Sequence, residues 1–111
     1  MKLPNAALAV IDPRKLRNYA LSPVHPVGRF KAAFFSRLGF TPANWESLDL
    51  ELRRMAVQEA AELGERTAFG QKYLVRGPLL GPKGLRAEIR CVWIILDGEQ
   101  APRLVTILPE D

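Results

Sequence analysis

The chain has 111 residues, of which 48% are hydrophobic and 25% are charged, a composition typical of one globular domain. A net charge of +4 favours a polyanionic partner. One cysteine and one histidine exclude an internal disulfide and a multi-thiolate metal site, so we expect chemistry without a metal or cofactor. No apolar run is long enough for a signal peptide or a membrane helix, which predicts a single cytoplasmic domain over residues 1–111 with no membrane partner.

Two dipeptides in the N-terminal half resemble helix starts. In Asp12-Pro13 and in Thr41-Pro42, a capping side chain precedes a proline suited to the first helical position. They predict one helix over residues 13–21 and another that continues to Gly64. The apolar residues of the second helix recur at three- and four-residue steps: Trp45, Leu48, Leu52, Met55, Ala56 and Leu63.

A third helix is predicted between these two, after a turn stiffened by Pro23 and Pro26. Gly39 is placed to end it as a left-handed cap. Its apolar stripe is predicted to consist of Phe30, Ala33, Phe34 and Leu38.

After residue 67 the pattern becomes alternating, and turn signals divide it into three strands, over residues 69–80, 85–96 and 103–108. In the middle strand every second residue is apolar and is expected to face the helices. The order of elements therefore predicts an α+β fold, with N-terminal helices packed on a C-terminal antiparallel sheet of three to four strands.

His25, the only histidine, precedes Arg29 and Lys31 by a few residues. Cleaving RNA without a metal requires a base for the 2′-hydroxyl, an acid for the departing 5′ oxygen and cations for the phosphorane. We interpret His25 as general acid or base and the two cations as phosphate ligands. The alternative is that His25 only shapes the turn and the cations cover a helix end.

The predicted strands carry further polar candidates. Arg103 and Thr106 join the catalytic set, as a cation and an orienting hydroxyl. The candidates for RNA and phosphate binding are Gln71, Lys72, Tyr73, Arg76, Arg86 and Arg90. Arginines can hold phosphate on a sheet face. The mixed charges, Glu88 included, are equally typical of cross-strand ion pairs worth about 0.2–1 kcal/mol each.

Several phrases together resemble one known family across nearly the whole chain. They include Leu3-Pro4-Asn5-Ala6, Tyr19-Ala20-Leu21, His25-Pro26-Val27-Gly28-Arg29, Phe69-Gly70-Gln71-Lys72-Tyr73 and Pro102-Arg103-Leu104-Val105-Thr106. The family is DUF6883, a bacterial domain of unknown function. It resembles, more distantly, the toxin ribonucleases of the barnase, EndoU, colicin and RelE group.

The resemblance implies a toxin-like ribonuclease that acts on RNA and is neutralised by a small acidic antitoxin or immunity protein. Relatives resemble either the tips of larger secreted toxins or free-standing proteins, and both arrangements stay open here. A different class of function is also open, namely a non-catalytic interaction module of the same fold, antitoxin-like or scaffold. A nucleic-acid binder without cleavage ranks third, because the aromatic residues fall at core spacing.

Overall fold

The computed structural model describes residues 1–110. The helical segments are η1 Ala6–Leu8, α1 Pro13–Lys15, η2 Leu16–Ala20, α2 Arg29–Leu38, η3 Pro42–Asn44 and α3 Trp45–Gln58. The strands are β1 Ala61–Arg66, β2 Gly70–Leu80, β3 Arg86–Leu96 and β4 Arg103–Pro109. They form one antiparallel sheet in the order β1-β2-β3-β4. The predicted α+β class, with helices first and the sheet last, is confirmed.

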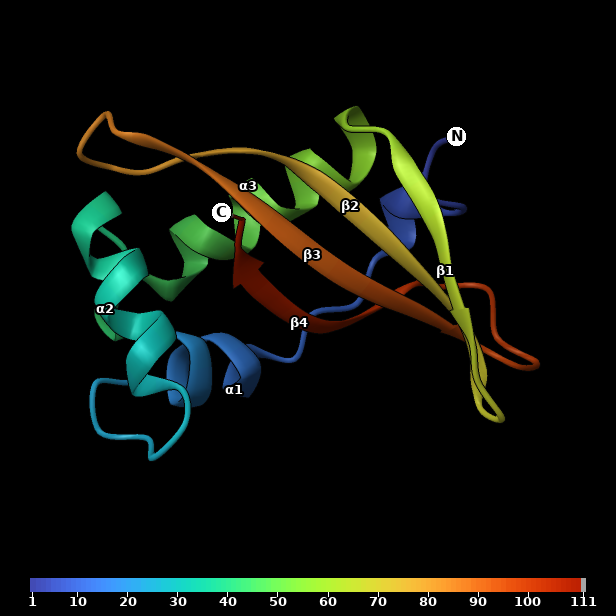
Figure 1. The fold of residues 1–111 in the computed structure, drawn as a ribbon, viewed down its shortest axis with the longest axis horizontal. Coiled ribbons are helices and arrows are strands. Elements are labelled where there is room, and N and C mark those ends of the chain that lie inside the picture. Colours follow the sequence, from blue (N-terminus) through green and yellow to red (C-terminus); the bar gives the residue numbers. More distant parts are fainter. Residues whose placement is uncertain (111) are drawn as a thin grey trace.

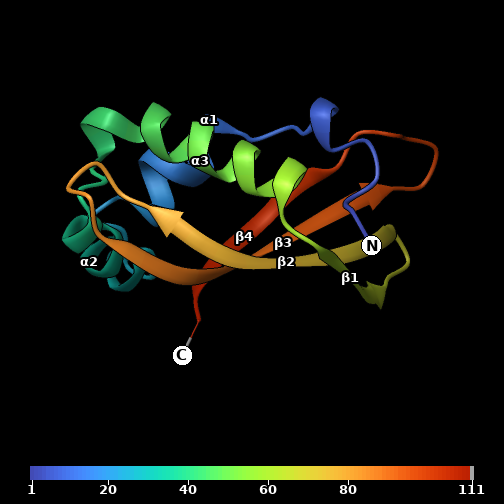
Figure 2. The ribbon, with the colours of Figure 1, turned by 90° about the horizontal axis from the view of Figure 1, so that it is seen from above.

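The helices cover one face of the sheet and leave the other open (Figures 1 and 2). The long helix α3 packs on the covered face, and α2 lies at one end beside β4. Val10 forms an isolated parallel bridge with Arg103, donating to the Pro102 carbonyl at 2.8 Å and accepting from the Leu104 N–H at 3.0 Å. The N-terminal segment therefore covers part of the outer edge of β4. No helix in residues 1–110 combines the length and apolar character that crossing a membrane requires.

The core lies between α3 and the covered face of the sheet. Leu48, Leu52 and Met55 of α3 are fully buried, as the three- and four-residue spacing predicts. Ile89, Cys91 and Trp93 of β3 are also fully buried, which confirms the predicted alternation of the middle strand. Together with the fully buried Val75, Leu79 and Leu16, these side chains form one contiguous core.

The prediction that the last helix reaches Gly64 is wrong. The helix α3 ends at Gln58, the backbone turns extended at Glu59, and Ala61–Arg66 becomes the edge strand β1. Leu63, assigned to the apolar stripe of the helix, is 66% exposed. Glu, Leu and Arg favour helix in isolation, but pairing with β2 and burial of Ala61 outweigh that local preference.

The apolar stripe predicted for α2 is right for Leu38 and Phe34, which pack on the core, and wrong for Phe30 and Ala33. Ala32, Phe35 and Leu38 are buried, whereas Phe30 is 68% exposed and Ala33 is exposed. Two overlapping stripes are available because Phe and Ala residues stand at neighbouring positions, and the spacing does not choose between them. The predicted end of the helix is confirmed, since Gly39 has φ +100°.

Cys91 gives a direct test of the core. Its side chain is fully buried, and burial raises the pKa of its thiol to about 12. Because the thiolate is the reactive form, we expect no alkylation by iodoacetamide in the native protein at mildly alkaline pH and complete alkylation in urea. Mass spectrometry distinguishes these results. Rapid alkylation of the native chain would contradict the burial of β3.

Candidate functional site

The turn before α2 is held by two side chains that accept backbone hydrogen bonds. Ser22 Oγ accepts from the N–H groups of Val24 at 3.4 Å and His25 at 3.2 Å. His25 Nδ1 accepts from the N–H groups of Val27 and Gly28, both at 3.0 Å. These four hydrogen bonds fix the backbone of the turn that leads into α2.

These bonds restrict what the His25 ring can do. Because Nδ1 accepts two N–H groups, the neutral ring carries its hydrogen on Nε2. The ring can donate a hydrogen bond from Nε2. It has no free nitrogen that could act as a base, because Nε2 already carries a hydrogen and Nδ1 accepts the two backbone N–H groups. The general acid or base role of His25 stays a prediction, and one that requires the ring to leave its caps.

His25 lies in a cluster of polar and aromatic side chains from four parts of the chain. Lys31 Nζ on α2 donates to Thr106 Oγ1 on β4 at 2.8 Å. The same ammonium is 4.8 Å from the centre of the Tyr19 ring on η2. Tyr19 meets His25 edge to face, with ring centres 4.9 Å apart. We call Tyr19, His25, Lys31 and Thr106 the Lys31 cluster.

Three members of the Lys31 cluster are sequence candidates, and the fold brings them together. Tyr19 is the member that the sequence analysis did not single out as a candidate. A signal was present, since Tyr19 stands in one of the phrases that carry the family resemblance.

A groove runs from the Lys31 cluster along the outer edge of β4. Its two adjoining hollows, of about 410 and 280 Å³, share Lys15 and Val105. Tyr19 and Thr106 line one end, and Arg103 lines the other. Lys15 Nζ donates to the Val105 carbonyl at 3.3 Å. We call this the β4 groove.

The charge of the β4 groove is mainly positive. Within residues 1–110, neither Lys15 nor Lys31 has a carboxylate partner. Asp12 is bound by Arg14 at 2.8 Å, and the hydrogen bonds from Arg14 lower the pKa of that carboxyl to about 2. Two lysines are thus available to an anion, while the one acidic residue of the groove is already neutralised.

Several other sequence candidates lie away from the Lys31 cluster. Arg29 stacks its guanidinium on the Phe30 ring at 4.8 Å. Gln71 Nε2 donates to the carbonyls of Gly64 and Lys72, so it holds the irregular pairing of β1 with β2. The remaining three lie apart: Tyr73 is half-buried against the core, Lys72 lies on β2, and Arg86 lines a hollow with Glu51 and Arg54.

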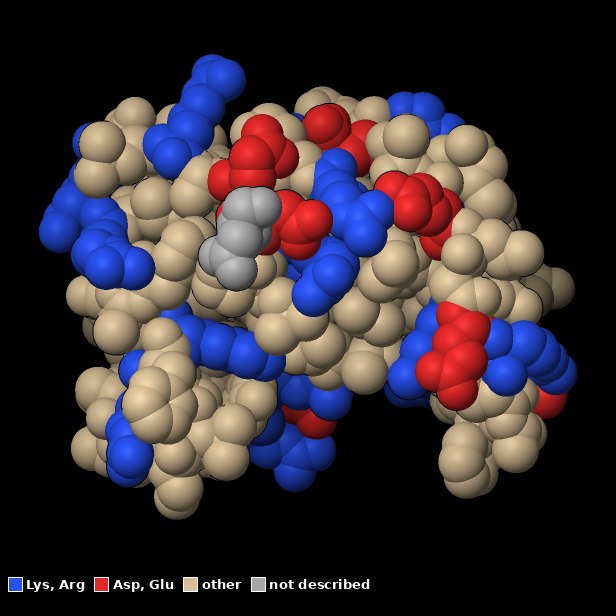
Figure 3. All heavy atoms as spheres, in the orientation of Figure 1, with Lys and Arg blue, Asp and Glu red and all other residues tan. Residues whose placement is uncertain are grey.

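Arg76 and Arg90 lie on the open face of the sheet in an ion-pair network. Arg76 binds Glu62 and, at 3.1 Å, Glu110. Arg90 lies 3.8 Å from Glu110. Positive side chains flanked by negative ones cover the middle of this face in Figure 3. Cross-strand ion pairs, the alternative interpretation of these arginines, are therefore present, with carboxylates other than that of Glu88.

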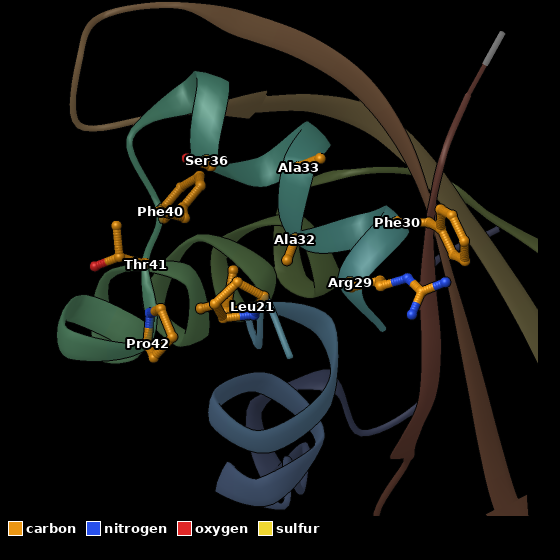
Figure 4. A pocket seen from close by; sticks show the side chains of 10 residues that line it. Leu21, Arg29, Phe30, Ala32, Ala33, Ser36, Phe40, Thr41 and Pro42 are labelled. Carbon is orange, nitrogen blue, oxygen red and sulfur yellow. The ribbon is translucent and has the colours of Figure 1, made fainter. Parts of the chain in front are cut away.

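A separate apolar pocket of about 580 Å³ lies beside α2 (Figure 4). Phe40, Thr41 and Pro42 line one side of it, and Arg29 and Phe30 line the other. Arg29 is the one charged residue among those that line it. This pocket offers apolar surface and lacks groups suited to acid–base chemistry.

The capping role of His25 predicts different outcomes for two substitutions. His25→Ala should lower the free energy of unfolding by about 1–2 kcal/mol, because two N–H groups lose their acceptor. His25→Asn should retain most of the stability, since an Asn side-chain oxygen accepts from the same N–H positions. Urea unfolding measures both. Equal losses in the two variants would contradict the capping role.

Comparisons with known proteins agree with the fold. A chain of the structure titled "Contact-dependent growth inhibition toxin - immunity protein complex from Klebsiella pneumoniae 342" is similar, with a TM-score of 0.67 and 17% identity, over 96% of this chain and 97% of that one. The search of curated proteins found no match. The model of DUF6883, a domain of unknown function, matches residues 2–111. This protein therefore belongs to the DUF6883 family.

Proposed function

We propose that this chain is a toxin-type ribonuclease domain that cleaves RNA without a metal ion, with the β4 groove as its active site. The observation that carries the proposal is the contact between Lys31 and Thr106. It joins a cation and a hydroxyl, 75 residues apart in the chain, beside Tyr19. Tyr19 and Thr106 line the end of the groove, together with a second lysine, Lys15, that has no carboxylate partner among residues 1–110. The fold shared with a chain of a toxin–immunity complex supports a place in a toxin–immunity pair.

In this proposal Lys31 and Thr106 bind the non-bridging oxygens of the scissile phosphate. These oxygens gain negative charge in the phosphorane, and a fixed ammonium stabilises that charge more than it stabilises the ground state. Lys15 binds a neighbouring phosphate in the same groove. Arg103, at the far end, contributes a further cation when it releases Glu99, which it now binds at 2.9 Å.

The cleavage step needs two proton transfers. The 2′ oxygen attacks phosphorus and its proton passes to water. The bond from phosphorus to the 5′ oxygen breaks, and that oxygen takes a proton from the Tyr19 hydroxyl, which is replenished from solvent. The products are a 2′,3′-cyclic phosphate and a 5′-hydroxyl. The edge-to-face contact of the His25 ring positions Tyr19.

A protein partner belongs to the same proposal. The turn before α2 exposes Val24 by 84% and Val27 by 58%, and the first turn of α2, which also carries Lys31, exposes Phe30 by 68%. An acidic antitoxin or immunity protein with apolar contact residues would match this surface in charge and in polarity. Such a partner is expected to block the β4 groove, and its association rate is expected to fall as salt rises.

The first experiment expresses the chain from a controlled promoter and measures cell growth and the integrity of total RNA. The second tests whether the purified protein cleaves a synthetic RNA. We expect growth arrest and fragments that end in a 2′,3′-cyclic phosphate. DNA of the same sequence should stay intact because it lacks the 2′ nucleophile. Purified protein that binds RNA but leaves it intact over a range of salt would overturn catalysis and favour the non-catalytic interaction module.

A further inference from the structure

Arg76 and Arg90 are direct cross-strand neighbours. The register of β2 and β3 pairs them, and both alternate with buried residues, so their side chains lie on the open face of the sheet. Like charges in directly opposite positions destabilise an antiparallel pair. Two arginines placed this way therefore favour an anion between them.

Glu110 provides that anion in the free protein. One carboxylate oxygen is 3.1 Å from Arg76 Nε, and the other is 3.8 Å from Arg90 Nε. The Glu110 N–H also donates to the Glu88 carbonyl at 3.0 Å, which fixes its backbone against β3. The carboxylate hydrogen-bonds Arg76 but reaches Arg90 only as a longer ion pair.

Arg90 consequently keeps an unused donor. Its Nε is buried and makes no hydrogen bond to residues 1–110. A buried charged donor without an acceptor is costly, so a better anion at this position is favourable. A phosphate has more acceptor oxygens than a carboxylate and suits the fork of donors on each guanidinium.

The arginine pair lies close to the β4 groove. Thr106 pairs with Val92, and Leu108 pairs with Arg90, so the two sites are two residues apart along the same face. Along the strand this is about 7 Å, and Arg90 and Arg76 lie one and two strands further across the sheet, at about 4.8 Å per strand. One extended RNA strand can therefore reach Lys31 and the arginine pair together.

We infer that Arg76 and Arg90 form a second phosphate site for the RNA strand, and that Glu110 occupies this site until RNA displaces it. The identity of the ligand rests on the proposed function, whereas the presence of an anion site does not. Glu62 stays on the opposite side of Arg76 and keeps it oriented. Glu110 thus lowers the affinity of the free protein for RNA.

The test uses the full chain and a fluorescent 2′-O-methyl oligonucleotide, which binds without being cleaved because it has no 2′-hydroxyl. Glu110→Gln should bind it roughly tenfold more tightly at low salt, the gain of one charge-assisted hydrogen bond. The slope of log K against log salt should steepen by about 0.7 for each additional phosphate that the protein binds. Arg90→Ala, added to Glu110→Gln, should remove both effects.

Glu88→Gln is the matched control, because it makes the same charge change on the same face and Glu88 has no ion pair among residues 1–110. Glu110→Ala repeats the test with a second side chain if the first variant folds poorly. Equal gains in affinity from Glu110→Gln and Glu88→Gln would overturn the site, as would no gain from Glu110→Gln or Glu110→Ala. If Glu110→Gln binds a poly-glutamate peptide more tightly than it binds the oligonucleotide, the arginines instead form a site for an acidic protein.

These outcomes separate the site from the proposed catalysis. A native chain that binds the oligonucleotide and cleaves no RNA would end the ribonuclease proposal, while the tighter binding by Glu110→Gln would still support the phosphate site. If the native chain cleaves RNA and Glu110→Gln does not change binding, the phosphate site is contradicted and the ribonuclease proposal stands.

Discussion

Replacing Lys31 with Met will leave a folded protein that cleaves RNA roughly 10²–10³-fold more slowly, the loss typical of removing one preorganised group that stabilises transition-state charge. The methionine keeps the length of the side chain but has no charge and no donor for Thr106. Because the variant loses one part-buried hydrogen bond and the contact of the ammonium with the Tyr19 ring, the free energy of unfolding should fall by about 1–2 kcal/mol. Initial rates on a labelled RNA, with urea unfolding in parallel, measure both effects.

Lys83→Met is the matched control for this variant. Lys83 is exposed in the turn between β2 and β3, far along the sheet from Thr106, and its loss changes the net charge by the same amount. Its cleavage rate should stay within a factor of about 3 of the native rate, since screened charges at this range contribute little. Equal losses in both variants would reduce the role of Lys31 to general electrostatic attraction for RNA.

Gly28→Ala should lower the free energy of unfolding more than Lys31→Met or Gly84→Ala does. A Cβ at this position would lie 1.9 Å from the carbonyl oxygen of Tyr19, which is backbone and cannot rotate away. The helix α2 and the segment η2 would have to separate, at a cost of about 1–3 kcal/mol or more. Cleavage should fall as well, because the same shift moves Lys31 away from Tyr19.

Gly84→Ala separates this clash from the ordinary cost of replacing glycine. Gly84 has φ +82°, and a Cβ added there would meet no atom within 4 Å, so its replacement should cost about 1 kcal/mol, from backbone strain alone. Urea unfolding of the two variants makes the comparison. If Gly28→Ala is no less stable than Gly84→Ala, close packing at Gly28 is not what fixes the site.

The fold is largely predictable from the sequence because its local signals agree with its tertiary contacts. Gly39 ends α2, and β3 alternates between a buried and an open face, as predicted. The errors occur where local signals compete with packing. Glu62 and Leu63 favour helix by themselves, yet they lie in β1 because β2 offers them a pairing partner.

The site is less predictable, because it depends on distances between elements. Nothing local to Lys31 indicates that it meets Thr106, since that contact depends on the register of β4 and on where α2 docks. The role of the His25 ring likewise depends on two backbone N–H groups. A sequence identifies such residue types, but it does not show which of their atoms remain available.

The bridge between Val10 and Arg103 has a consequence for synthesis of the protein. The edge of β4 meets residues from the start of the chain, and the same strand supplies Thr106 to Lys31. While β4 is still inside the ribosome, the groove has no floor and Lys31 has no hydroxyl partner. Under the proposed function, cleavage of RNA therefore begins only after the last strand has left the ribosome.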